Sequence, residues 1–198
     1  MRHWDGIDNA TPGAEMAVMT ANAAQQTWSV DLGRSDIPAV FFAAALPIIL
    51  FIGANWAGEL FALRPLFFAP FGLAGWLAGV FHIGSLPLFG VGAYLAWRVG
   101  GQGHQAAGWT IALVVATVAF PFLVGLLDSL MLSILSMGLV LLGLSASARV
   151  AKVSPVGAMV MAPGLLWLGF SAFLGLSFVA SWSPPFGITN ASQSAAAA

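Results

Sequence analysis

Residues 156–181 read VGAMVMAPGLLWLGFSAFLGLSFVAS and contain no charged side chain. A helix needs roughly 20 consecutive apolar residues to cross about 30 Å of hydrocarbon. This stretch exceeds that length and is followed by the Ser-Pro-Pro of residues 183–185, which stops a helix. It therefore predicts a membrane-spanning helix over Val156–Ser181.

Four further apolar runs precede this stretch. Each is continuous, whereas the strands of a membrane barrel alternate apolar and polar residues, so helices are favoured. The sequence predicts an all-α fold, a polytopic membrane protein whose five transmembrane helices form a bundle in the lipid bilayer. The four earlier helices are expected over Ile37–Gly58, Gly72–Trp97, Trp109–Leu127 and Ser129–Ala148, and only the connection between the third and fourth is expected to be tight.

The composition excludes several other classes of protein. The 198 residues are 60% hydrophobic and 7% charged, whereas an ordinary soluble domain carries about 25% charged residues. Six Lys and Arg residues and a net charge of −1 provide no surface to neutralise a run of phosphates, so nucleic acid is not a partner. The absence of Cys excludes disulfides and thiolate metal sites.

Polar sequence is concentrated at the two ends of the chain. Residues 1–36 form a charged arm that lacks the apolar run of a signal sequence, residues 37–182 contain the five spans, and residues 183–198 form an Ala-rich tail. The arm contributes little apolar surface to the helices. We therefore expect it to bind other membrane-protein subunits rather than to stabilise the bundle.

The few cations predict the topology. With five spans, Arg34, Arg98, Arg149 and Lys152 fall on one side of the membrane and Arg64 on the other. Cytoplasmic loops carry the excess of Lys and Arg. The N-terminus is therefore expected in the cytoplasm.

His82 is the one ionisable residue expected deep within a span. With no second such group, neither a proton relay nor a catalytic set of nucleophile, base and acid can be assembled, so the protein is not expected to be an enzyme. A buried imidazole can donate a hydrogen bond to a backbone carbonyl or a Ser, which is the favoured interpretation. It can also be an axial ligand to the metal of a tetrapyrrole, because Ala78 and Gly79 leave room beside it.

Aromatic and small residues suggest a binding pocket and packing surfaces. Trp56, Trp76 and Trp167 lie deep enough that they can line a pocket for a flat apolar ligand, but core or lipid-facing packing is the favoured interpretation for each of them. Prolines inside helices can open cavities between them, and small residues four apart predict close packing, within the monomer or in a homodimer. The prolines are Pro47, Pro87, Pro121 and Pro163, and the small-residue pairs are Gly75 with Gly79 and Ser171 with Gly175.

The last apolar run also resembles a known family. Pro163, Trp167, Phe170 and Leu174 match the Pro-Tyr-x-x-Trp-x-x-Phe-Ala-x-x-Leu-Asn pattern of the TspO/MBR family, the translocator or tryptophan-rich sensory proteins. The Tyr of that pattern is Gly164 here, and its Asn is Gly175. Arg64-Pro65 and the stretch Tyr94 to Arg98 are similar to the family's first loop and to the end of its second helix.

The resemblance implies a non-catalytic five-helix protein of a bacterial inner or intracytoplasmic membrane, often dimeric. It further implies binding of a flat lipophile, either a tetrapyrrole (haem, porphyrin or bacteriochlorophyll) or a carotenoid. The candidate binding residues are then His82, Trp56, Trp76, Trp167 and Phe170, with His82 as the candidate metal ligand. The alternative is an accessory subunit of a larger membrane assembly, such as a photosynthetic reaction-centre or light-harvesting complex.

Overall fold

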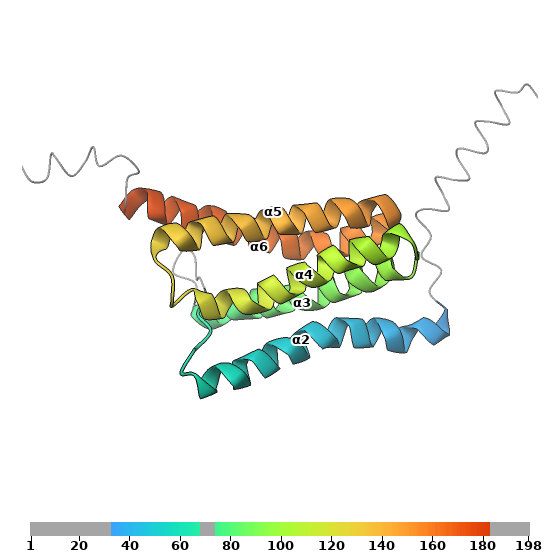
Figure 1. The fold of residues 1–198 in the computed structure, drawn as a ribbon, viewed down its shortest axis with the longest axis horizontal. Coiled ribbons are helices and arrows are strands. Elements are labelled where there is room, and N and C mark those ends of the chain that lie inside the picture. Colours follow the sequence, from blue (N-terminus) through green and yellow to red (C-terminus); the bar gives the residue numbers. More distant parts are fainter. Residues whose placement is uncertain (1–32, 68–73, 183–198) are drawn as a thin grey trace, which may run out of the picture.

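The computed structural model describes residues 33–67 and 74–182, and within these ranges the chain is all-helical (Figure 1). A short 3-10 helix, η1, precedes five long helices, each long and apolar enough to span a membrane. The predicted all-α fold with five transmembrane helices is therefore confirmed. The elements are η1 (Arg34–Asp36), α2 (Ile37–Leu60), α3 (Gly75–Trp97), α4 (Gln102–Leu123), α5 (Ser129–Val153) and α6 (Pro155–Trp182).

Helix α3 occupies the centre of the bundle. It packs against α2, α4 and α6, whereas α5 packs mainly against α4 and α6 and α2 lies at the edge (Figure 1). Leu86 and Phe89 of α3, Leu113 of α4 and Met161 of α6 are fully buried. The core is thus built around the second of the five long helices.

The outer surface of the bundle is apolar. Phe41 and Phe42 of α2 and Leu166 of α6 are 73%, 69% and 74% exposed. Water would not favour this arrangement, but lipid tails solvate such side chains. The distribution of apolar residues supports the bilayer as the surrounding medium.

Two glycines let the helices approach closely. A Cβ at Gly90 of α3 would overlap the carbonyl oxygen of Ala43 in α2, and that carbonyl lacks its helical donor because residue 47 is Pro. A Cβ at Gly164 of α6 would lie 2.8 Å from the Phe89 ring. Gly164 therefore makes room for Phe89.

The small-residue pairs identified in the sequence do not make these contacts. Gly75 has open space around it, Gly79 faces the Phe67 ring of the segment between α2 and α3, and Ser171 and Gly175 line a pocket. Close packing of these pairs against another helix of the same chain is therefore not found, and packing in a homodimer stays a prediction. Spacing alone cannot show which face of a helix meets a neighbour.

Several helix boundaries also differ from the prediction. Helix α4 begins at Gln102 rather than Trp109, and α5 continues to Val153, so that Ser154 alone separates α5 from α6. The prediction that only the third-to-fourth connection is tight is therefore wrong. Asp128 lies at the end of the connection between α4 and α5: it is exposed, and its carboxylate accepts a hydrogen bond from the backbone N–H of Met131 at 2.8 Å.

Polar contacts cluster at the end of the bundle where α2 begins. The Arg98 guanidinium lies 3.0 Å from the Asp36 carboxylate, and the Tyr94 hydroxyl donates a hydrogen bond to Asp36 at 3.4 Å. The Arg149 guanidinium lies 4.4 Å from the centre of the Trp109 ring. At this end of the membrane span, the first two contacts join the start of α2 to α3, and the third joins α4 to α5.

Candidate functional site: a pocket beside His82

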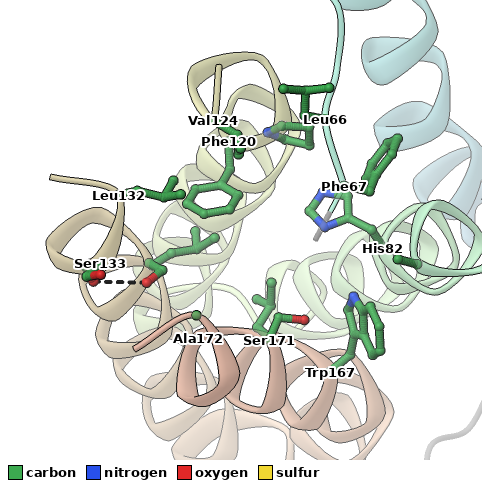
Figure 2. A pocket seen from close by; sticks show the side chains of 16 residues that line it. Leu66, Phe67, His82, Phe120, Val124, Leu132, Ser133, Trp167, Ser171 and Ala172 are labelled. Atoms are coloured by element: carbon green, nitrogen blue, oxygen red, sulfur yellow. Dashed lines mark hydrogen bonds between the residues drawn. The ribbon is translucent and has the colours of Figure 1, made fainter. Parts of the chain in front are cut away.

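A pocket of about 260 Å³ lies toward the opposite end of the bundle, and Figure 2 shows the side chains that line it. It is bounded by α3, α4, α5 and α6 and by the segment that follows α2. The lining residues are Leu66, Phe67, Ala78, His82, Phe120, Pro121, Val124, Leu132, Ser133, Ser136, Leu139, Trp167, Leu168, Ser171, Ala172 and Gly175. None of these side chains carries a formal charge at neutral pH if His82 is neutral.

Pro121 explains the position of His82. In a helix the Thr117 carbonyl would accept a hydrogen bond from the N–H four residues later, but residue 121 is Pro, which has none. The His82 Nε2 lies 2.9 Å from this carbonyl oxygen. The imidazole of α3 thus supplies the donor that Pro121 removes from α4.

This contact resolves how His82 is paired at membrane depth. The side chain is 7% exposed, and the hydrogen bond to a backbone carbonyl is the arrangement favoured from the sequence. Because a carbonyl only accepts, Nε2 carries the proton and has no lone pair to give to a metal. The residues present therefore do not fit axial ligation of a tetrapyrrole metal through Nε2.

The segment after α2 closes one side of the pocket and is also tied to Pro121. The backbone N–H of Leu66 donates a hydrogen bond to the Pro121 carbonyl at 2.9 Å. The next residue, Phe67, places its ring 5.5 Å from the His82 ring and 6.1 Å from that of Phe51 in α2. In Figure 2 the Phe67 ring lies beside His82 at the edge of the cavity.

Of the candidate tryptophans, only Trp167 lines this pocket. It forms the wall beside His82 in Figure 2, and its ring centre lies 5.0 Å from that of Phe81 and 6.1 Å from that of Phe170. Phe170 itself does not line the pocket but supports Trp167 from the outside, where it is 40% exposed.

Trp56 and Trp76 are not part of this site. They are 68% and 71% exposed on the outer surface of α2 and α3. Each lies on a helix face that no other described helix covers. The number of tryptophans and their depth in a span do not show which face of the helix each one occupies. These two candidate binding residues therefore do not line the pocket with His82, and their exposure agrees with lipid-facing packing, which is part of the interpretation favoured from the sequence.

The opposite wall, which sequence reasoning missed, comes from α4 and α5. It includes Phe120 and Leu132 together with the hydroxyls of Ser133 and Ser136, where the Ser136 hydroxyl donates to the Ser133 carbonyl at 2.9 Å. One signal in the sequence marks this region, because Pro121 predicts a carbonyl in need of a donor one turn earlier. Across the described residues no group of three or more His, Asp or Glu side chains is placed to hold a metal ion.

These features define a class: an integral membrane protein of five helices with an apolar pocket between them. Comparison with models of protein families identifies the family within this class. The TspO/MBR family model matches residues 37–180, and the chain belongs to that family. Comparison with curated proteins gives no match, and neither does comparison with solved structures.

Proposed function

We propose that this TspO-like membrane protein binds a flat lipophilic ligand in the pocket beside His82 and does not act as a catalyst. The observation that carries the proposal is an apolar, uncharged cavity between four helices, with Trp167 and Phe67 as aromatic walls. Ligand sites in proteins are concave, largely apolar and supplied with a few polar groups. His82 and the serines provide those polar groups.

The size of the pocket bears on the choice between a tetrapyrrole and a carotenoid. Pockets for drug-sized ligands span about 300–1,000 Å³, and this one encloses about 260 Å³. A single ring system with a short chain fits this volume. A tetrapyrrole would enter by one edge and leave the rest of the macrocycle outside.

Fluorescence titration tests the proposal. The protein in lipid nanodiscs is titrated with retinol, a carotenoid-derived lipophile, and with protoporphyrin IX, and quenching of tryptophan emission reports binding. We expect Trp167→Leu to weaken binding of the ligand at least tenfold, while Trp56→Leu, on the outer surface, leaves it unchanged. Equal affinities in wild type and Trp167→Leu would remove the pocket as the site.

We also propose that the N-terminus faces the cytoplasm. Support comes from the end of the bundle where α2 begins, which holds Arg98, Arg149 and Lys152. Most of the arm predicted to bind other subunits, residues 1–32, lies outside the described residues. Its role in a photosynthetic or other assembly stays a prediction, as does the homodimer.

A further inference from the structure

We infer that the pocket selects a neutral lipophile that carries a hydrogen-bond donor, an O–H or N–H group, at its edge, and that Nδ1 of His82 accepts this hydrogen bond. The inference rests on the proposed function and specifies the chemistry of the ligand. It follows from the tautomer of one side chain, which the backbone of α4 determines.

The tautomer follows from the Thr117 carbonyl. Its oxygen lies 2.9 Å from Nε2 of His82, and it has no helical donor because residue 121 is Pro. The proton must therefore lie on Nε2. An imidazolium is excluded by cost, since no carboxylate lines the pocket and an unpaired charge at membrane depth is expensive. A neutral ring protonated on Nε2 has its lone pair on Nδ1.

Nδ1 is directed at the cavity. His82 is 7% exposed and lines the pocket, and no described residue donates a hydrogen bond to Nδ1. Every fully enclosed side-chain nitrogen or oxygen among the described residues has a partner, so the unpaired Nδ1 is open to the pocket. Figure 2 shows the ring edge between Phe67 and Trp167, facing the empty space. An acceptor in such a place is satisfied when a bound molecule donates to it.

The rest of the lining determines what else the ligand can carry. With no cation among the described lining residues, a carboxylate on the ligand would be buried without a partner. A porphyrin directs its N–H groups to its own centre and carries carboxylates at its rim. An alcohol or a lactam instead presents its donor at the edge, where Nδ1 can reach it. The pocket is therefore built for a lipophilic alcohol or lactam rather than for a porphyrin.

Three retinoids that share one apolar skeleton test this inference. Retinol carries an O–H donor, retinyl methyl ether has the donor capped, and retinoic acid at pH 8 is an anion. Affinities are measured by tryptophan-to-retinoid energy transfer in nanodiscs, corrected for partition into nanodiscs without protein. We expect retinol to bind about tenfold more tightly than the ether, and the acid to bind more weakly than retinol.

Variants test whether His82 causes the preference for retinol over retinyl methyl ether. In His82→Phe the retinol-to-ether ratio should fall to about one, whereas Trp167→Phe should keep the ratio. If His82→Phe does not fold, the double variant His82→Phe/Pro121→Ala is used, with Pro121→Ala alone as its control, because replacing Pro121 by Ala returns an N–H to the Thr117 carbonyl.

Equal binding of retinol and ether by wild type, or a ratio unchanged without His82, overturns the inference and leaves the proposed function standing. Binding of no retinoid overturns the inference, and the proposed function falls with it only if protoporphyrin IX does not bind either. Equal binding of retinoic acid and retinol overturns the requirement for a neutral ligand.

Discussion

Replacing His82 by Phe should expose how strongly the bundle depends on the hydrogen bond between α3 and α4. Phe keeps an apolar aromatic ring of similar size in a site that is 7% exposed, but it cannot donate to the Thr117 carbonyl. A buried carbonyl left without a donor costs about 1–3 kcal/mol, and hydrogen bonds between membrane helices measure about 0.6 kcal/mol on average and about 1.7 at most. We expect a loss of about 1–2 kcal/mol in the free energy of unfolding.

The same substitution should cost less in a Pro121→Ala background. Pro121→Ala restores an N–H four residues after Thr117, so the carbonyl keeps a helical donor when His82 is removed. The two substitutions should therefore couple by about 1 kcal/mol, with the double variant more stable than the sum of the single effects predicts.

Unfolding in mild detergent, followed by circular dichroism, measures all four proteins of this cycle. For a chain of this size 1 kcal/mol corresponds to about 2–4 °C in the midpoint. His104→Phe is the matched control, because His104 is exposed on the same bundle and only stacks on Trp97, at 4.2 Å between ring centres. If His82→Phe costs the same in the wild-type and Pro121→Ala backgrounds, the carbonyl is not what His82 satisfies, and the reasoning fails.

Three further predictions concern packing, topology and the polar end of the bundle. Gly90→Ala should destabilise the bundle by about 1–3 kcal/mol, because the new Cβ meets the α2 backbone. Gly84→Ala, in open space on the same helix, should be neutral or stabilising by up to about 1 kcal/mol. Equal midpoints of the two variants in thermal unfolding would contradict this prediction. A single Cys at Gln102, in a chain with no native Cys, should be protected from impermeant thiol reagents in intact cells, and ready labelling would reverse the topology. Asp36→Asn should lower the free energy of unfolding by less than about 1 kcal/mol, because the partner Arg98 is 34% exposed. Raising the salt concentration should reduce this difference between wild type and variant. A larger, salt-independent loss of stability would show that the ion pair is shielded from solvent.

The number and type of the helices were predictable because long apolar runs respond to one dominant requirement, the thickness of the hydrocarbon. The residues at which the helices begin and end were less predictable. Gln102 and His104 reduce the apolarity of the first turn of α4 without preventing a helix, and Arg149 and Lys152 are good helix formers that continue α5 toward Ser154. Hydropathy indicates which residues lie in lipid, whereas a helix continues for as long as its backbone N–H and C=O groups can form helical hydrogen bonds.

The candidate site was predictable only at residues whose chemistry is costly in lipid. His82 had to find a partner, and the sequence indicated a backbone carbonyl as the favoured one. The identity of that partner depends on contacts between helices 35 residues apart in the chain, which a linear pattern does not contain. Trp56, Trp76 and Trp167 are alike in sequence, and only packing separates the one that faces the pocket from the two that face outward.

The unequal burial of α2 and α3 has a consequence for biosynthesis. Among the described spans α2 combines the highest mean hydropathy with the smallest buried share, while α3 combines the lowest with the largest. Of these two described spans, α2 leaves the ribosome before α3, and it is the one that needs fewer protein neighbours in lipid. The next, which carries the imidazole, reaches its stable environment only after α4 has followed it into the membrane. An insertion factor that shelters α3 during this interval would matter more to the yield of folded protein than one that assists α2.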